Sequence, residues 1–203
     1  KTVDALPEDF DRIIGCDGAH SMVRKCLGLK EPNFRLGIQG FVPEGNNSDY
    51  VETWPVEHGF IWKIPRGQEV EYGIMAGSRE AKTLLDEFLS RNNIKTIRTA
   101  SALIPQGLIV PKNVSVTLCG DAAGLTKPWS GGGVIWSLTA SDMLLKNFPD
   151  FLQYQKELKR KFLPRIALSK LILKLVYFFG FKTPWLMPKN YVIESDFLIS
   201  YKK

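Results

Sequence analysis

The chain has 203 residues, 44% hydrophobic and 24% charged, enough apolar mass for a core in one or two domains and a composition that argues against intrinsic disorder. Its 27 lysines and arginines outnumber 21 aspartates and glutamates, and this excess favours anionic partners such as phosphate-bearing cofactors or lipid headgroups. Three widely spaced cysteines form no disulfide framework or zinc motif, which indicates a reducing, cytoplasmic setting. With only two histidines, the sequence predicts no metal site.

The first third of the chain predicts a strand, a turn, a helix and then a sheet. Residues 11–15 form a short apolar run that leads into the turn Asp17-Gly18, and residues 20–27 carry helical spacing. Between residues 34 and 76, four short strand-like runs are separated by Pro, Gly and Asn. Such close spacing predicts an antiparallel meander.

A helix and two further strands are predicted next. Apolar residues recur with helical spacing over 81–89, where Ser78 is placed to cap the helix and Asn92-Asn93 to end it. Residues 98–104 and 114–119 predict strands, and the second is a continuous apolar run of the kind buried in layered α/β cores.

The C-terminal part predicts helices. One should run from Val134 to about residue 147, and another from 151 to 162, where Pro164 interrupts it. Residues 165–181 form an apolar run that contains lysines, which keeps it below the length of a membrane-spanning helix. Two interpretations remain open: an amphipathic helix that covers the core, or a surface that contacts a membrane.

The strongest chemical signal lies in residues 118–133. A buried strand ends at Gly120 and presents the carboxylate of Asp121, and a later glycine triplet begins the helix at Val134. Backbone N–H groups at such a helix start attract anions, and an aspartate accepts hydrogen bonds from ligand hydroxyls. Two alanines after Asp121 are expected to leave room for a planar ligand. The alternative is an ordinary glycine-rich turn with a solvated Asp.

This stretch resembles the GDAA…P…GG loop of the glutathione-reductase-type FAD family, which includes aromatic hydroxylases and geranylgeranyl reductases. The resemblance implies that Asp121 holds the ribityl chain, that the helix start faces the isoalloxazine ring, and that Pro128 lies beside it. The cofactor-binding residues implied here are Gly120, Asp121, Ala122, Pro128, Gly131, Gly132, Gly133 and Val134.

A second segment, residues 14–24, resembles the GADGxxSxxR segment of the same family. It adds Cys16, Asp17, Gly18 and Arg24 to the implied cofactor-binding residues. By itself an Asp-Gly pair is a common turn; its order relative to the downstream loop is what supports the resemblance. Cys16 replaces the usual alanine, and we expect it to serve packing and not redox chemistry.

The third segment, residues 59–65, resembles the aromatic-x-Trp-x-x-Pro element of geranylgeranyl reductases. Phe60, Trp62 and Ile64 alternate along a strand and therefore share one face. That face is either ordinary sheet core or an apolar wall for a long lipid. The resemblance implies substrate-binding roles for Trp54, Phe60, Trp62, Ile64 and Pro65.

These signals predict a mixed α/β (α+β) fold: a partial FAD-binding layered domain, an antiparallel-sheet substrate domain and C-terminal helices. Residues 1–33 and 98–148 are assigned to the FAD-binding domain, 34–97 to the substrate domain, and 149–203 to the helical segment. The chain has no initiator Met and no GxGxxG unit for the FAD pyrophosphate. We therefore expect a truncated protein, or one completed by a partner, with low affinity for free FAD.

The resemblance implies an FAD-dependent oxidoreductase that reduces isoprenoid double bonds of a prenyl lipid, with NAD(P)H or ferredoxin as electron donor. Peripheral membrane contact is one of the two interpretations of residues 165–181. One alternative is a flavin monooxygenase or halogenase built on the same loop. Another is a non-catalytic, membrane-peripheral binding module. Nucleic acid is disfavoured because the basic residues are dispersed. No catalytic residue is assigned, and Tyr72, His58 and Cys16 are candidates for the proton donor.

Overall fold

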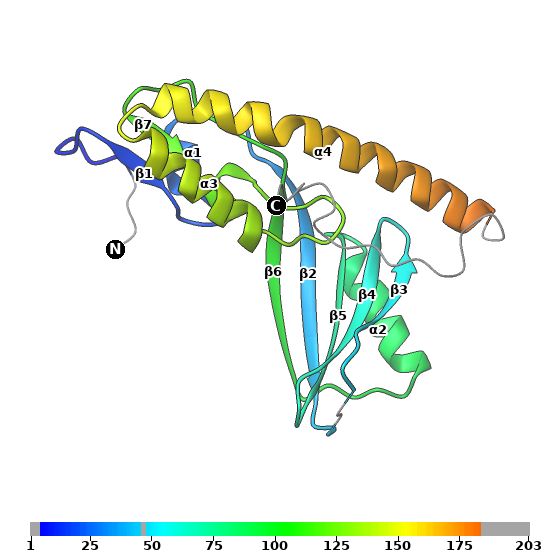
Figure 1. Ribbon diagram of the computed structural model, residues 1–203. Coiled ribbons are helices and arrows are strands. Elements are labelled where there is room, and N and C mark those ends of the chain that lie inside the picture. Colours follow the sequence, from blue (N-terminus) through cyan, green and yellow to red (C-terminus); the bar gives the residue numbers. More distant parts are fainter. Residues whose placement is uncertain (1–4, 46–47, 184–203) are drawn as a thin grey trace.

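The computed structural model describes residues 5–45 and 48–183, which form two regions joined by a long helix (Figure 1). The first region holds a small parallel sheet with two helices and a 3-10 helix around it, and the second holds a five-stranded antiparallel sheet with one helix on its face. The first comprises β1 (Ile13–Gly15), α1 (Met22–Cys26), β7 (Val116–Leu118), the 3-10 helix η1 (Gly120–Ala123) and α3 (Val134–Asn147). The predicted mixed α/β fold with an antiparallel sheet and C-terminal helices is confirmed.

The large sheet has the strand order β3-β4-β5-β2-β6, and every neighbouring pair is antiparallel. Its strands are β2 (Asn33–Val42), β3 (Glu52–Val56), β4 (Gly59–Pro65), β5 (Val70–Gly77) and β6 (Arg98–Gln106). Only β3, β4 and β5 follow one another as a meander, because β2 lies between β5 and β6. Since β6 belongs to this sheet, the sheet extends past the predicted domain boundary at residue 97.

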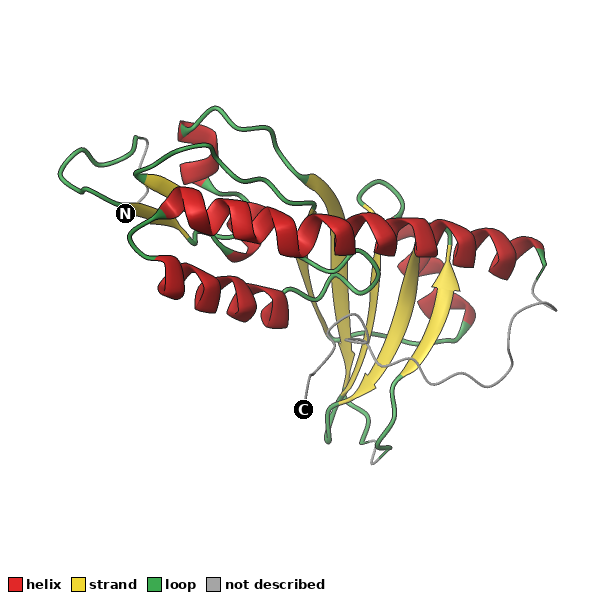
Figure 2. Ribbon diagram, turned by 45° about the horizontal axis from the view of Figure 1, so that its top comes forward, coloured by secondary structure: helices red, strands yellow, loops and turns green. Residues whose placement is uncertain are grey.

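The two faces of the sheet have different coverings. α2 (Ala81–Arg91) packs on one face, where Leu85 lies against the fully buried Ile61 and Ile74. Because side chains alternate along a strand, the intervening residues Phe60 and Met75 point to the opposite face. Figure 2 shows the strands side by side, with α4 crossing their upper ends.

The ends of α2 differ in how well they were predicted. Its N-cap position is Glu80, and no side chain caps the helix, so the expected capping by Ser78 is wrong. Glu80 instead donates its backbone N–H to the carbonyl of Gly77, which closes a tight turn directly after β5. The C-terminal end is at Asn92, and Asn93 follows with a φ of 54°, as expected for residues that stop a helix.

The small parallel sheet brings two distant segments together. β1 pairs in register with β7, with Gly15 opposite Leu118, and β7 is buried as predicted. A Cβ on Gly15 would lie 2.7 Å from Leu118 Cδ2 and 2.9 Å from Val23 Cβ, so glycine allows α1 to approach this strand. The residues that follow both strands emerge at the same carboxyl-terminal edge, where ligands bind in open α/β sheets.

α4 (Phe151–Lys182) is one continuous helix, so the predicted interruption at Pro164 is wrong. Pro164 is solvent-exposed, where the carbonyl that loses its helical partner can bond to water. The opposite side of the helix stays buried through Phe162 and Ile166, and this packing sustains the helix across the proline. Residues 184–203, the remainder of the predicted helical segment, lie outside the described part. Among the described helices, none combines the length and apolarity that a membrane span requires.

Candidate functional site

The Asp17-Gly18 turn is built to start α1. The Asp17 carboxylate accepts hydrogen bonds from the backbone N–H groups of Met22 (2.7 Å) and Val23 (3.1 Å). Burial alone would raise the pKa of Asp17, but the hydrogen bonds from Ser21, Val23 and Met22 outweigh it and lower the pKa. Gly18 has a φ of 80°, which suits glycine. Asp17 is therefore committed to capping, and it contributes to a site by fixing the turn.

Arg24 is a structural link inside the protein. Its side chain is fully buried and donates to the carbonyls of Ala122 (2.8 Å) and Ala19 (2.7 Å) and to the carboxylate of Glu31 (2.6 Å). The guanidinium therefore ties the Asp17-Gly18 turn to η1. The implied role of Arg24 in cofactor binding is corrected accordingly: the side chain has no open side and acts on a ligand only through these two loops.

The two alanines of η1 also serve packing. Ala122 and Ala123 are fully buried and lie against Val23 and Leu29 beside α1. Their small size lets η1 approach that helix. The expectation that they leave room for a planar ligand is wrong for their side chains, because protein atoms already fill the space around them.

The loop between η1 and α3 is shaped by glycine and anchored to β6. Gly131 has a φ of 69°, and a Cβ there would lie 2.6 Å from Met75 Sδ, so only glycine allows the loop to lie so close to the sheet. Thr126 Oγ1 donates to the carbonyl of Pro105 (2.6 Å), and Gln106 Nε2 donates to the carbonyl of Pro128 (3.2 Å). Pro128 is buried at this anchor.

A cavity of about 470 Å³ opens where this loop, α3 and β6 meet. Asp121, Gly131, Gly133 and Val134, all predicted, line it together with seven further residues: Ala102, Leu103, Ile104, Thr126, Ser137, Leu138 and Ser141. Gly132 lies between two of the lining glycines, and its backbone N–H is bonded to Ser130 Oγ (3.3 Å).

Asp121 is the ionisable group of this cavity. Burial raises the pKa of its carboxyl group, and no protein group donates a hydrogen bond to that carboxyl within the described residues. A Cβ on Gly133 would lie 3.0 Å from Asp121 Oδ1, so the carboxylate lies directly beside the start of α3. That helix has no side-chain cap. The pair offers a hydrogen-bond acceptor for hydroxyl groups next to N–H donors that favour negative charge.

Cys16 and Cys119 form a thiol pair at the same edge of the parallel sheet. They directly follow the paired residues Gly15 and Leu118, and the backbone N–H of Cys119 donates to the carbonyl of Gly15 (2.9 Å). The hydrogen bond from Cys16 lowers the pKa of Cys119 to about 6, although burial opposes this, and the same bond raises the pKa of Cys16. The sequence contained no signal for this pairing, because the cysteines meet only through strand register.

The predicted aromatic wall lies on the same face of the sheet as the loop. Phe60, Trp62 and Ile64 share that face through alternation along β4, and the rings of Phe60 and Trp62 are 5.6 Å apart. Trp62 Nε1 donates to the buried Glu71 carboxylate (2.8 Å), and the indole lies over Gly73, where a Cβ would be 2.3 Å from the ring. The indole is therefore held in one orientation.

Strand register connects this wall to the cavity. Phe60 is paired with Met75, Met75 with Gly37, and Gly37 with Ala102. We call this line of four residues the cross-strand row. Ala102 lines the Asp121 cavity and Met75 contacts Gly131, so the row places the wall and the cavity on one continuous surface.

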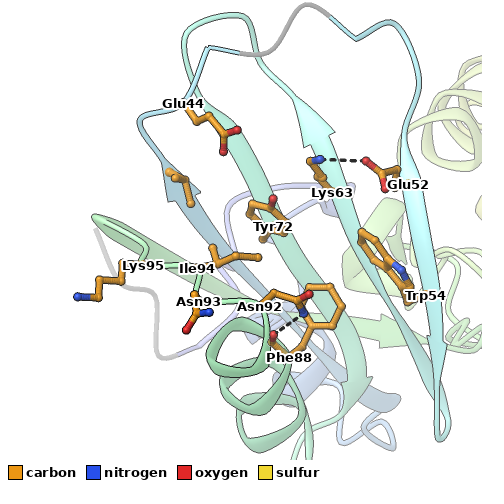
Figure 3. A pocket seen from close by; sticks show the side chains of 11 residues that line it. Glu44, Glu52, Trp54, Lys63, Tyr72, Phe88, Asn92, Asn93, Ile94 and Lys95 are labelled. Atoms are coloured by element: carbon orange, nitrogen blue, oxygen red, sulfur yellow. Dashed lines mark hydrogen bonds and ion pairs between the residues drawn. The ribbon is translucent and has the colours of Figure 1, made fainter.

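Trp54 lies on the other face of the sheet, so its implied place in the wall is wrong. Its ring packs 4.9 Å from that of Phe88 on α2, and both line a second cavity of about 430 Å³ (Figure 3). Alternation puts Pro65 on this side as well. Figure 3 shows Tyr72 and the ion pair of Lys63 with Glu52 (3.0 Å) in the same cavity.

Of the three candidate proton donors, two lie away from the Asp121 cavity. Tyr72 is buried on the α2 face, and burial raises the pKa of its hydroxyl group. His58 is exposed at the turn between β3 and β4. Cys16 alone adjoins the edge from which Asp121 emerges, and its thiol is engaged with Cys119.

Several residues of the cavity were missed from the sequence. Ser137 and Ser141 line it from α3, one helical turn apart, and Ala102 and Ile104 line it from β6. The serines had a readable signal, since both follow the glycine helix start at helical spacing. The β6 residues had none, because their position depends on the strand order of the sheet.

Sequence comparison relates this chain to prenyl reductases, although no family model matches it. It is 31% identical over 142 residues to a digeranylgeranylglycerophospholipid reductase of Methanococcus vannielii, a match that covers 60% of this chain and 36% of the relative. It is 28% identical over 155 residues to a chloroplastic geranylgeranyl diphosphate reductase of Oryza sativa, covering 66% of this chain and 33% of the relative. The chain thus spans about a third of the length of these relatives.

Structure comparison gives the same fold. A geranylgeranyl bacteriochlorophyll reductase-like protein of Thermoplasma acidophilum superposes with a TM-score of 0.67 at 20% identity, over 80% of this chain and 49% of the other. A flavin-dependent halogenase of Brevundimonas superposes with a TM-score of 0.63 at 16% identity, over 87% and 42%. The chain is therefore a homologue of digeranylgeranylglycerophospholipid and geranylgeranyl diphosphate reductases, with a fold that flavin-dependent halogenases share.

Proposed function

We propose that this chain provides the ribityl and isoalloxazine side of the FAD site, together with the prenyl-binding surface, of an oxidoreductase that reduces isoprenoid double bonds. The observation that carries the proposal is the position of Asp121. Its carboxylate lies beside the start of α3, in a cavity that the cross-strand row joins to the Phe60-Trp62 wall. The sequence relationship to prenyl reductases supports the same substrate class.

The residues of the Asp121 cavity fit the central part of a flavin cofactor. Asp121 accepts hydrogen bonds from ribityl hydroxyls, and the uncapped start of α3 favours the negative charge of the reduced ring. Gly131 and Gly133 leave the backbone accessible, because neither has a side chain that would fill the cavity. Arg24 and Asp17 hold η1 and the Asp17-Gly18 turn in place through hydrogen bonds outside the cavity.

The wall of Phe60 and Trp62 suits a long apolar chain. Both rings are half-buried on the face that carries the loop, so a prenyl group lying on them would remove further apolar surface from water. Trp62 is fixed by Glu71, whose other carboxylate oxygen accepts from Arg66 Nη2 (2.7 Å). A wall fixed before binding loses little side-chain entropy when the lipid arrives.

When bound, the flavin would supply hydride transfer to a carbon–carbon double bond, with electrons from NAD(P)H or ferredoxin. The chain's own residues orient the reactants and exclude water. Met75 and the Gly131 loop cover the sheet between the cavity and the wall, so a lipid on the wall is shielded from solvent on that side. The protein positions the two reactants on one surface and so lowers the entropic part of the barrier.

The cofactor part of the proposal is tested by titrating the protein with riboflavin and with FAD and following flavin fluorescence. Because charged hydrogen bonds contribute about 1.5–3 kcal/mol, Asp121→Ala should weaken both ligands roughly tenfold or more. The matched control is Asp142→Ala, which removes an exposed carboxylate of α3 that does not line the cavity. Equal affinities of Asp121→Ala and the unchanged protein would refute the proposed site.

The reaction is tested anaerobically with the protein loaded with reduced FAD. Addition of a geranylgeranyl phospholipid should reoxidise the flavin and yield a lipid with fewer double bonds, detected by mass spectrometry. If reoxidation requires oxygen and gives a hydroxylated product, or a halogenated one when halide is present, the monooxygenase or halogenase alternative holds. If the protein binds lipid and no flavin, it is a non-catalytic binding module.

A further inference from the structure

The second half of α4 presents an apolar stripe to solvent. Leu168, Leu171, Leu175 and Phe178 follow one another at intervals of three, four and three residues, so they share one side of the helix. Their exposed fractions are 46%, 56%, 48% and 52%. We call these four residues the outer stripe. In the first half of α4, by contrast, the large apolar residues at this spacing are buried against α3 and β7.

The inner side of the same helix segment is attached to the sheet. The hydroxyl group of Tyr177 donates to the carbonyl of Gly59 at 2.7 Å. Gly59 begins β4, directly before Phe60 of the aromatic wall. The outer stripe therefore faces away from the sheet, and its exposure follows from how the helix is attached.

The charge of this segment has a single sign. Residues 158–182 contain seven lysines and arginines and no aspartate or glutamate. Lys170 and Lys174 are exposed and lie beside the outer stripe on the helix surface, and Lys182 Nζ lies 5.1 Å from the centre of the Phe178 ring. An apolar stripe bordered by lysines is typical of helices that lie in the interface of an anionic bilayer.

We propose that the outer stripe of α4 binds the surface of an anionic lipid membrane. Leucine and phenylalanine side chains enter the boundary of the acyl chains, and Lys170 and Lys174 lie at the level of the headgroups. A second copy of this chain fits less well, because packing the stripe on itself would bring lysines together without any carboxylate in the segment. The membrane proposal is independent of the flavin site.

Cosedimentation of the protein with vesicles tests this inference without any flavin or turnover. Vesicles of mixed phosphatidylcholine and phosphatidylglycerol should bind the protein, and vesicles of phosphatidylcholine alone should bind it much more weakly. Lys170→Gln with Lys174→Gln should lower the partition coefficient roughly 30-fold, since each lysine near an anionic surface contributes about a factor of five. The control is Lys25→Gln with Lys30→Gln, two exposed lysines at the other end of the molecule.

A second pair of variants tests the apolar contribution. Leu171→Ser with Phe178→Ser should reduce binding at least about tenfold, because both side chains enter the bilayer. Leu145→Ser with Leu152→Ser removes two exposed apolar side chains outside the stripe and should leave binding unchanged. The proposal is overturned if Leu171→Ser with Phe178→Ser binds normally, or if both lipid compositions bind equally. It is also overturned if light scattering shows a dimer that this double variant dissociates, because the stripe would then contact a second copy.

Discussion

The two faces of the five-stranded sheet come from the same strands and have opposite properties. On the α2 face, the side chains of Ile61 and Ile74 are at most 1% exposed and pack under the helix. On the loop face, the half-buried rings of β4 have glycine and alanine on the neighbouring strands beside them, and the Gly131 loop lies against Met75 and Ile104. A strand thus places packing residues and binding residues one position apart, and only the covering element distinguishes them.

The largest expected effect breaks the α2 face. Ile74→Ala should lower the free energy of unfolding by about 2–5 kcal/mol, because it leaves a cavity under α2. Urea denaturation measures this loss. If the faces are independent, riboflavin affinity in the folded variant stays within a factor of about two, because a substitution changes the energetics of a distant, independent site by only a few tenths of a kcal/mol. A large loss of affinity would show that the two faces are coupled.

The next effect acts on the loop face. Gly131→Ala should cost about 1–3 kcal/mol, because it forces a side chain into a left-handed backbone conformation and against Met75. The loop must move away from the sheet, so flavin affinity falls as well. Gly132→Ala is the matched control, since a Cβ there meets only the flexible Ser130 side chain at 3.3 Å. Thermal unfolding and flavin titration of both variants test the difference.

A smaller effect separates the two tryptophan-bearing surfaces. Phe60→Ala should raise KM for a prenyl lipid roughly tenfold, because a ring is lost from the wall. Trp54→Ala should lower stability through its lost contact with Phe88 and leave KM unchanged. Steady-state kinetics and denaturation, measured on both variants, give this comparison. A raised KM in Trp54→Ala alone would place the substrate in the cavity under α2.

The smallest effect concerns the partly buried carboxylate of Asp121. The folded-state pKa of Asp121 lies above its ordinary value of 3.8, so its ionised form destabilises the protein at neutral pH. This destabilisation disappears as the pH falls through the folded-state pKa. Asp121→Asn should therefore raise stability at pH 7.5 by less than about 1 kcal/mol, since the half-exposed carboxylate is screened by solvent. The gain should vanish near pH 4, as measured by thermal unfolding at both pH values.

The sequence predicted local elements well where one residue dominates the local energetics. Gly131 and Asn93 have left-handed backbone conformations, which glycine and asparagine tolerate best. The sequence predicted the loop at Gly131 and the helix end at Asn93. The alternation of Phe60, Trp62 and Ile64 likewise followed from strand geometry alone.

What sequence reasoning could not supply was the relation between distant segments. The place of β2 between β5 and β6 depends on tertiary pairing. The face of the sheet on which Trp54 lies also depends on tertiary pairing, since it is set by the register of β3 with β4. Arg24 was interpreted as a ligand contact because the residues next to it in the sequence do not indicate that it is buried against Ala122, which lies 98 residues further along the chain. Pro164 was expected to end a helix, but the packing of Phe162 and Ile166 outweighed its local cost.

The continuous course of α4 has a mechanical consequence. Near its start, Tyr154 and Gln155 hydrogen-bond to the strand-end carbonyls of Leu118 and Val116, and near its end Tyr177 bonds to Gly59. The helix is thus hydrogen-bonded to the small parallel sheet near one end and to β4 of the large sheet near the other. If one region rotated against the other, α4 would have to bend, or the hydrogen bonds at one of its ends would have to break. The separation between Asp121 and the Phe60 wall is accordingly set by this helix together with the hydrogen bonds that anchor the loop between η1 and α3 to β6.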